Sequence, residues 1–288
     1  MGSSTRASQI TGFDHLIVGS RKLGDLCEAW LRLGFTLTPR ATDRHGARAL
    51  YRVMFARHAI ELRGFADASD ARQILGGLPG GGERFEALAL RTADVDAAAG
   101  TLRAAGHSLG SPSTHEPTIE LPNAEARAAF RLLPLPARAT PSLNAFLCQP
   151  LREDRVWRGA WSDHLNGARA ITAVTMVLDD PSVVAIPYGE LFGYDRVRVQ
   201  DGLVSVSCTD VALRFMAQAA LGRLHPVLAR TPPPALPWLA AVEVEVESLG
   251  RCRDYLEAVG LPHEHLREGC LGTPPAGPNG FAVDFVEG

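Results

Sequence analysis

Four stretches of the chain repeat one order of apolar and polar positions. Each begins with alternating or continuous apolar residues typical of a β-strand, passes through turn residues, continues with helical periodicity and ends at a glycine. The strand runs start at Phe13, Phe85, Ile171 and Leu239, and the glycines are Gly34, Gly106, Gly193 and Gly260. A glycine there suits the left-handed position that ends a helix. The pattern therefore indicates four copies of one β-α unit.

Further strand-like stretches follow the glycine in the first and third units. They cover 35–40, 47–56 and 58–65 in the first unit and 195–200, 203–210 and 211–217 in the third. Asp201 and Gly202 mark a hairpin turn between two of them. Leu23, Leu26 and Trp30 form the apolar stripe of a helix that packs on a sheet. The complete pattern is a β-α-β-β-β module present four times, which predicts an α+β fold with mixed sheets.

The connectors between the modules indicate two halves. Those at 76–84 and 230–237 are rich in glycine and proline, whereas the connector at 150–170 is charged and aromatic. We take the latter as the boundary between two domains, at 11–155 and 156–288. A chain of 288 residues is long enough for two domains of ordinary size.

Composition excludes several classes of function. Apolar residues make up 46% and charged residues 21%, as in ordinary globular proteins, and the net charge of −3 is unlike the basic excess of nucleic-acid-binding proteins. No apolar run reaches the ~18 residues of a membrane span. Five scattered cysteines without a CxxC pair are typical of reduced thiols. We therefore expect a cytoplasmic protein whose partner is a small-molecule ligand or substrate, without nucleic acid or membrane; a homodimer stays open.

Several short motifs accompany the modules. They are "FDHLIV" at 13–18, "LGF" at 33–35, "IEL" at 60–62 and "DHLNGA" at 163–168. With four β-α-β-β-β modules over nearly the whole chain, the sequence resembles glyoxalase-like proteins of the vicinal oxygen chelate superfamily, which also contains bleomycin resistance proteins and extradiol dioxygenases. The resemblance implies two domains of two modules each, in which a cupped mixed sheet holds the active site.

The resemblance also implies a metal site. In metal-using members, a histidine from the first strand and a glutamate from the last strand of a module bind a divalent ion, so His15 and Glu61 are the expected ligands for Fe, Mn, Ni or Zn. The second module has Ala87 opposite His15 and offers Cys148 and Gln149 in its closing strand, so half of the shell is missing. The second half has no histidine at the matching places, and an extradiol dioxygenase is therefore not expected.

Other residues extend the expected site in the N-terminal cup. In a lyase or isomerase, Glu61 serves as general base, His15 as proton carrier, and His164 with Asn166 as donors to a developing oxyanion. Arg63 shares a strand face with Glu61 and pairs with a substrate carboxylate. We expect substitution of His15 or Glu61 to abolish binding but to change stability by only about 1 to 2 kcal/mol.

A second function remains open from the sequence alone. The incomplete second module is compatible with a metal-free protein that sequesters an aromatic or other small molecule. Trp157 and Trp161 in the connector could form its aromatic wall, although aromatic residues make up only 7% of the chain. Three further histidines are expected to be solvated side chains of loops or turns, at positions His45, His58 and His115.

Overall fold

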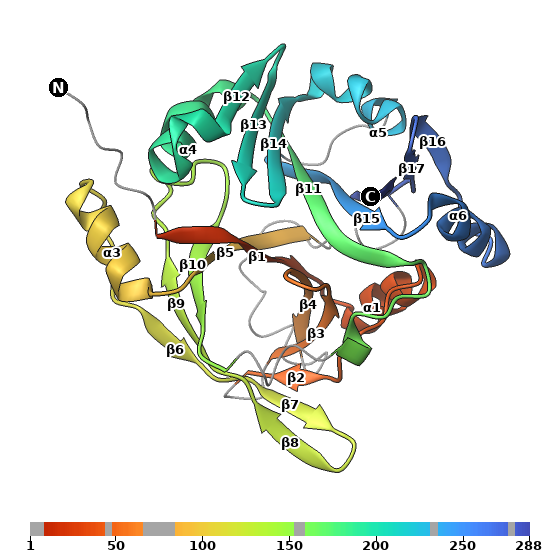
Figure 1. Ribbon diagram of the computed structural model, residues 1–288, viewed down its shortest axis with the longest axis horizontal. Coiled ribbons are helices and arrows are strands. Elements are labelled where there is room, and N and C mark those ends of the chain that lie inside the picture. The colour runs from red at the N-terminus through yellow and green to blue at the C-terminus, as the bar shows by residue number, and fades with distance from the viewer. Residues whose placement is uncertain (1–8, 44–47, 66–83, 153–158, 231–235, 276–279) are drawn as a thin grey trace.

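The computed structural model describes residues 9–43, 48–65, 84–152, 159–230, 236–275 and 280–288 (Figure 1). Its described strands form two curled mixed sheets with helices against them, which confirms the α+β fold of two vicinal-oxygen-chelate-type halves. The N-terminal sheet comprises β1 (Ile10–Gly19), β2 (Ala41–Thr42), β3 (Arg48–Met54), β4 (Ala59–Phe65), β5 (Arg84–Thr92), β6 (Ser113–His115), β7 (Thr118–Leu121), β8 (Ala124–Arg127), β9 (Phe130–Pro134) and β10 (Ala145–Pro150).

The remaining elements belong mostly to the C-terminal half. Its sheet comprises β11 (Ala168–Leu178), β12 (Val197–Gln200), β13 (Leu203–Cys208), β14 (Val211–Ala217), β15 (Trp238–Val246), β16 (Glu264–Arg267), β17 (Cys270–Gly272) and β18 (Ala282–Glu287). The α-helices are α1 (Leu23–Arg32), α3 (Val95–Ala104), α4 (Ala185–Phe192), α5 (Pro226–Arg230) and α6 (Leu249–Ala258). Short 3-10 helices are η2 (Gly159–Trp161), η3 (Pro181–Val184), η4 (Tyr194–Arg196) and η5 (Gln218–Arg223).

The strand pairing follows the four modules. In each module the first strand pairs parallel with the last: β1 with β4, β5 with β10, β11 with β14 and β15 with β18. The first strands of neighbouring modules pair antiparallel, β1 with β5 and β11 with β15. The predicted glycines at the helix ends all have positive φ. At Gly34, with φ of 90°, an added Cβ would also lie 2.7 Å from the Tyr255 ring.

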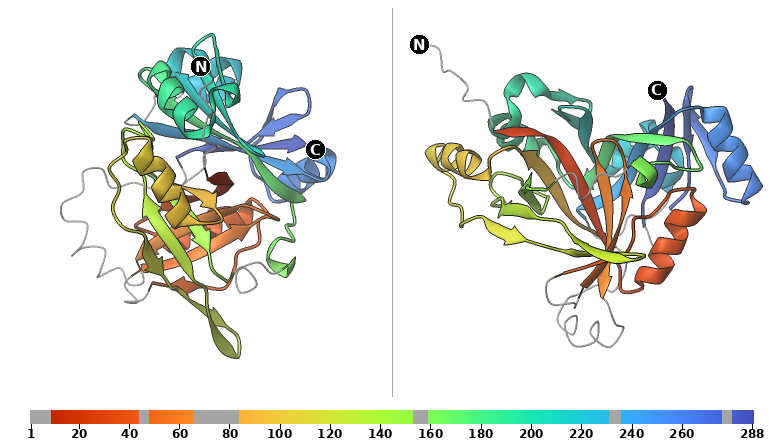
Figure 2. Two further views of the ribbon diagram at one scale, coloured as in Figure 1. Left: turned by 60° about the vertical axis from the view of Figure 1, so that its left-hand side comes forward. Right: turned by 60° about the horizontal axis from the view of Figure 1, so that its bottom comes forward.

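The N-terminal sheet curls into an almost closed cup. Its strand order is β6-β9-β10-β5-β1-β4-β3-β2-β7-β8, so β6 and β7 belong to opposite flanks. Only Glu116 and Pro117 separate these two strands in the chain, and three peptide steps span at most about 11 Å. The two flanks must therefore approach one another, as the curled strands of Figure 2 show. The C-terminal order, β12-β13-β14-β11-β15-β18-β17-β16, has no such closing connection among its described strands.

One continuous core joins the two halves. Buried residues of both sheets, such as Leu16 and Val174, belong to it together with side chains of the helices that cover them. Trp30 of α1 lies 6.2 Å from Phe281 of the C-terminal half, measured between ring centroids. The opposite face of the N-terminal sheet lines the cup and has its own smaller cluster, which includes Met54 and Phe130.

The structure differs from the sequence-based expectations in two places. Segment 35–40 is not a strand, and β2 covers only Ala41–Thr42. The reason is that the Thr36 N–H donates to the His164 imidazole and Pro39 has no N–H, so a regular ladder cannot form. The β7–β8 hairpin, which closes the cup against β2, was not predicted. The predicted boundary between residues 155 and 156 lies outside the described residues.

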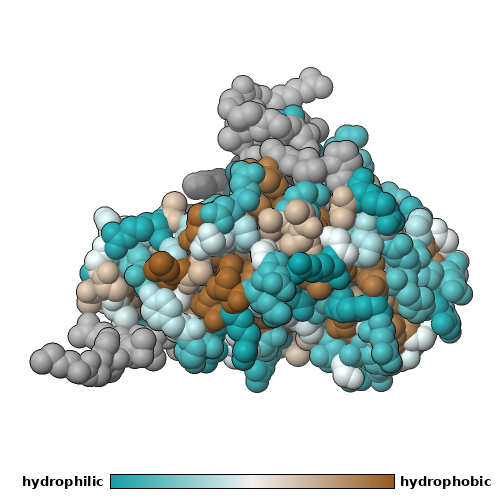
Figure 3. Space-filling model, turned by 90° about the horizontal axis from the view of Figure 1, so that it is seen from above, coloured by the Kyte–Doolittle hydropathy of each residue, from teal (hydrophilic) through white to brown (hydrophobic). Residues whose placement is uncertain are grey.

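One face of the molecule shows scattered apolar side chains. Seen from above in Figure 3, the molecule is largely hydrophilic, with brown patches interspersed among polar residues. Such scattered exposure of apolar side chains is common in monomeric proteins. Among the described helices, none is long and apolar enough to cross a membrane.

Candidate functional site

Strand alternation separates the two faces of the N-terminal sheet. On β1 and β4, Leu16 and Ile60 point into the common core, whereas the alternate residues His15 and Glu61 point into the cup. A register shift between Phe13 and His15 against β5 interrupts the alternation. Such a bulge places consecutive residues on one side of a strand, so Asp14 lies beside His15.

Two arginines hold both carboxylate oxygens of Glu61. Arg52 on β3 donates from Nε and Nη2 to Oε2 at 3.0 and 2.7 Å, and Arg63 donates from Nε and Nη2 to Oε1 at 2.9 and 2.5 Å. Glu61 is 1% exposed. Burial is the largest single effect and opposes ionisation, but Arg63 and Arg52 together keep the pKa of Glu61 far below its usual value. Glu61 is therefore a permanent carboxylate and a weak base.

A second buried group faces the cup around Asp14. His15 Nδ1 is 2.6 Å from Asp14 Oδ1, and Arg91 Nε is 3.0 Å from Asp14 Oδ2. Burial works against ionisation of Asp14, yet hydrogen bonding and charge from His15, followed by Arg91 and Arg52, hold its pKa below the ordinary value. Cys148 on β10 completes the group, and burial raises the pKa of its thiol well above the usual range.

Two sets of side chains on this face are candidate metal ligands, and they differ in how well they could bind an ion. His15 with Glu61, the set that the family resemblance implies, does not fit, because both Glu61 oxygens already form ion pairs with arginine. Asp14, His15 and Cys148 offer ligand atoms that all lie within 4.8 Å of one another, so this group could hold a metal ion. An ion there would have to replace two existing contacts of Asp14 and the proton of a thiol whose pKa is raised.

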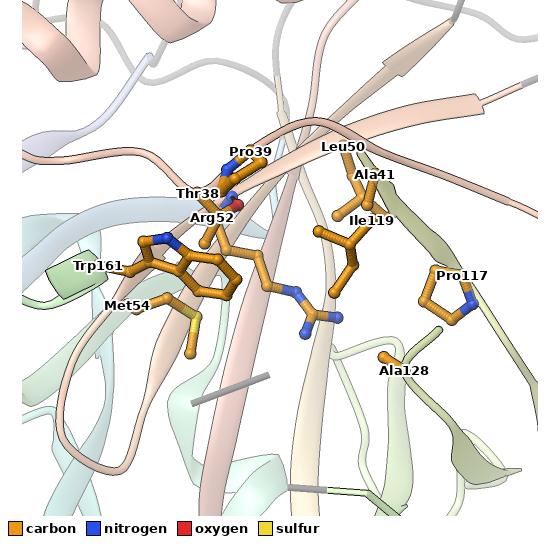
Figure 4. Close-up of a pocket in the computed structure, with 10 residues that line it drawn as sticks. All are labelled: Thr38, Pro39, Ala41, Leu50, Arg52, Met54, Pro117, Ile119, Ala128 and Trp161. Carbon is orange, nitrogen blue, oxygen red and sulfur yellow. Dashed lines mark hydrogen bonds between the residues drawn. The ribbon is translucent and has the colours of Figure 1, made fainter. Parts of the chain in front are cut away.

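An apolar cavity lies beside Arg52. It contains about 320 Å³ of space, part of it open to solvent, and Figure 4 shows its ten lining residues. The Arg52 side chain runs between Trp161 and Met54 on one side and Ile119 on the other (Figure 4). Its guanidinium carbon lies 5.2 Å from the centroid of the Phe130 ring, a cation–π distance.

Charged side chains of both signs face the cup. The guanidiniums of Arg52, Arg63 and Arg91 pair with the carboxylates of Asp14 and Glu61, and the carboxylates of Glu86 and Asp43 also act on Arg63. His115 at the end of β6 adds an imidazole at the rim. Burial lowers the pKa of His115, and the nearby Glu61 only partly opposes this, so the imidazole adds little charge at neutral pH. Arg52 is the charged side chain that lines the apolar cavity.

The structure brings only some of the predicted site residues together. His15, Glu61, Arg63 and Trp161 all lie at the cup, from three separate parts of the chain. His164 is instead buried against the backbone: Nδ1 accepts from the Thr36 N–H at 3.0 Å, and Nε2 lies 2.9 Å from the Met54 carbonyl oxygen.

Asn166 is likewise engaged with backbone groups. Its side-chain amide donates to the Leu33 carbonyl at 2.8 Å and accepts from the Ala168 N–H at 3.0 Å. Both residues thereby fasten the connector between the halves, and this placement favours a positioning role in the fold over contact with a ligand in the cup.

The sequence did not indicate that several further residues belong to the same cup. These are Asp14, Arg52, Arg91, Cys148 and His115. The "FDH" motif contained Asp14, but only the bulge turns its side chain towards His15. Arg52 and Arg91 lie on strands whose pairing partners the sequence does not specify. The expectation that His58 is solvated was wrong: it is 3% exposed and Nε2 lies 3.1 Å from Asp210 Oδ2. His45 lies outside the described residues.

The ion pairs of the cup predict acid sensitivity. The pKa values of Asp14 and Glu61 are lowered in the folded state, so these groups stabilise the protein above the unfolded carboxyl pKa of about 4, and the contribution is lost as the pH falls below it. We expect the free energy of unfolding from urea titrations to decrease between pH 5 and pH 2.5. The decrease should be smaller in Glu61→Gln and unchanged in Glu120→Gln, whose carboxylate is exposed. Equal pH dependence in all three proteins would contradict this assignment.

Comparison with known proteins places the chain in a family. Residues 13–192 match the family model described as a glyoxalase-like domain. The chain belongs to this glyoxalase-like family. No curated protein sequence matches the glyoxalase-like chain. Its membership of the vicinal oxygen chelate superfamily, expected from the modules and motifs, is confirmed.

Solved structures agree with the fold of this glyoxalase-like protein. A hypothetical protein from Staphylococcus aureus superposes with a TM-score of 0.64 and 13% identity, over 96% of this chain and 98% of the other. A catechol 2,3-dioxygenase superposes with a TM-score of 0.57 and 14% sequence identity, over 97% of this chain and 88% of the other. A variant of 4-hydroxymandelate synthase from Streptomyces coelicolor superposes with a TM-score of 0.57 and 10% sequence identity, over 96% of this chain and 92% of the other. At these identities the likeness concerns the fold alone.

Proposed function

We propose that the N-terminal cup binds a small, mainly apolar or aromatic molecule that carries a carboxylate or a comparable anionic oxygen. One observation carries the proposal. Arg52 gives Nε and Nη2 to Glu61, while its Nη1 has no hydrogen-bond partner within the described part of the chain and lies at an apolar cavity. A guanidinium that is held in place in this way is pre-organised to donate to an anion.

The walls of the cavity support an apolar body for the ligand. Trp161, Met54 and Ile119 surround the Arg52 stem and offer flat or flexible apolar contacts. Arg63 is about a quarter exposed and provides a second cation on the same strand face as Glu61. Sites of this kind, with mainly apolar walls and few polar groups, are typical for small molecules.

For turnover as a lyase or isomerase, we assign different roles to the two residues that the sequence singled out. His15 is the candidate proton carrier, because its ring faces the cup and Asp14 at 2.6 Å orients it. Glu61 is a positioning residue, because its pKa is far too low for a general base at neutral pH and it holds Arg52 and Arg63.

The experiment that tests ligand binding uses benzoate, with the neutral isostere benzamide as a matched probe. We expect benzoate to raise the melting temperature and to bind measurably by calorimetry, and benzamide to bind at least about tenfold more weakly, since a charged hydrogen bond contributes about 1.5 to 3 kcal/mol. Arg52→Met and Trp161→Ala should weaken benzoate binding. Arg127→Met, on the exposed hairpin strand β8, is the control and should bind normally. Equal affinity for both probes would contradict the proposal.

A metal-assisted enzyme is the second candidate, favoured by the cluster of Asp14, His15 and Cys148. A borderline ion such as Zn²⁺ accepts carboxylate, imidazole and thiolate ligands and would supply Lewis-acid chemistry. Metal analysis of the purified protein after incubation with Mn, Fe, Ni or Zn tests it. Because Arg52 and Arg91 lower the affinity for cations, we expect far less than one equivalent. Near-stoichiometric metal that is lost in both His15→Ala and Cys148→Ala, but kept in Glu61→Gln, would favour the enzyme.

A further inference from the structure

A small cavity lies in the C-terminal half, away from the N-terminal cup. It is formed where His225, directly before α5, approaches β16 through Glu264 and β18 through Asp284, and it contains about 210 Å³ of space, part of it open to solvent. In Figure 1, α5 lies beside β16 and β17 at the flank of the C-terminal sheet. Leu228 and Leu266 contribute apolar walls.

Buried acceptor atoms without partners line this cavity. The side chains of His225 and Asp284 are 3% and 1% exposed, and His225 Nδ1 lies 3.0 Å from Asp284 Oδ2. Three further atoms, His225 Nε2, Asp284 Oδ1 and Glu264 Oε1, are buried and have no hydrogen-bond partner among the described residues. Buried polar atoms are nearly always paired, so three such atoms at one cavity indicate a bound group that supplies donors.

The charge around the cavity defines the kind of donor. Glu243, on the neighbouring strand β15, pairs with Arg214 at 3.0 Å and with Arg267 at 2.6 Å. This trio carries one net positive charge, and its members Glu243 and Arg267 act on Asp284. Together with the carboxylates of Asp284 and Glu264 the net charge of these five side chains is −1, so a monocation restores neutrality. The Thr273 hydroxyl is already bonded to the backbone of Val283 and offers no free donor. Burial raises the pKa of Asp284, and His225 and Arg267 oppose this only in part.

We propose that this cavity binds the ammonium group of a short aliphatic primary amine, with Asp284 Oδ1, Glu264 Oε1 and His225 Nε2 as acceptors and Leu228 and Leu266 against the alkyl chain. An ammonium group has three N–H donors and one positive charge, which match three acceptors and the missing charge. The two halves of the protein thus offer sites of opposite charge, an anion site in the N-terminal cup and a cation site here. The second site does not depend on the first.

The test is calorimetric titration of the full-length protein with n-propylammonium chloride at constant ionic strength. We expect saturable binding, with tetramethylammonium and potassium chloride at least about tenfold weaker, because neither cation has N–H donors. Glu264→Gln and Asp284→Asn should each weaken binding about tenfold or more. Glu268→Gln, an exposed neighbour on the same hairpin, is the matched control and should bind as the parent protein.

Three outcomes would overturn the proposal. They are the absence of saturable n-propylammonium binding, equal binding of potassium, and unchanged binding by Glu264→Gln. If Asp284→Asn fails to fold, Glu264→Gln alone decides, since its side chain is only half-buried. Arg52→Met should retain amine binding while it loses benzoate, so failure at one site can be told from failure at the other.

Discussion

Glu61→Gln is expected to lower the free energy of unfolding by about 3 to 5 kcal/mol, because it leaves two guanidiniums of the cup without their counter-charge. Arg52 and Arg63 each donate twice to this carboxylate, and Arg52 is only about a tenth exposed. A glutamine has one carbonyl oxygen, so its NH2 group, a donor, faces the other guanidinium in place of an acceptor. Urea denaturation at pH 7 measures the effect.

Two matched variants separate charge from packing. Glu120→Gln removes the carboxylate of an exposed pair with Arg40 and should change stability by less than about 1 kcal/mol. The double substitution Glu61→Leu with Arg52→Met should recover part of the loss, because buried ion pairs replaced together by apolar residues are often neutral. A Glu61→Gln protein as stable as the parent would contradict the stabilising role of the Glu61 ion pairs with Arg52 and Arg63, and would favour the role as general base or metal ligand that the sequence suggested.

His164→Ala is expected to cost about 3 to 5 kcal/mol of stability and to leave benzoate binding in the cup unchanged. The substitution leaves the part-buried Thr36 N–H and the buried Met54 carbonyl without a partner, at up to about 1 to 3 kcal/mol each, and opens a cavity between two aromatic rings. The His164 ring lies 5.4 Å from Phe35 and 5.3 Å from Phe55, between ring centroids. Burial lowers the pKa of His164, so the neutral Nε2–H tautomer serves both backbone contacts.

The control for this variant is His265→Ala, which removes an exposed histidine and should change stability little. Thermal and urea unfolding measure stability, and calorimetry measures benzoate affinity in the same samples. If His164→Ala keeps its stability but loses binding, the residue belongs to the ligand site, as the "DHLNGA" motif suggested.

The structure changes what we expect for the contribution of the site residues to stability. Glu61 and His15 were expected to contribute little to stability, as site residues often do. That expectation stays for His15, whose ring touches one carboxylate of the cup and Phe146. For Glu61 the structure predicts the opposite, because it is the counter-charge of two arginines inside the sheet.

Local patterns in the sequence determined the modules. Apolar alternation, helical periodicity and the glycine at each helix end depend on a residue and its near neighbours, so they indicated the four β-α-β-β-β modules and the cup face shared by Glu61 and Arg63. The family resemblance rested on the same local motifs. These local patterns could not predict the contacts between strands, because alternation of apolar residues does not specify which strands pair.

Only the tertiary structure decided what the cup contains. The β7–β8 hairpin closes the sheet against β2, a bulge turns Asp14 towards His15, and pairing of β3 with β4 brings Arg52 onto Glu61. The same assembly buries His164 against the N-terminal half and leaves acceptors around Asp284 without a partner among the described residues. Ion pairs and cavities form between distant segments, and their energy depends on burial, which the order of residues along one strand does not fix.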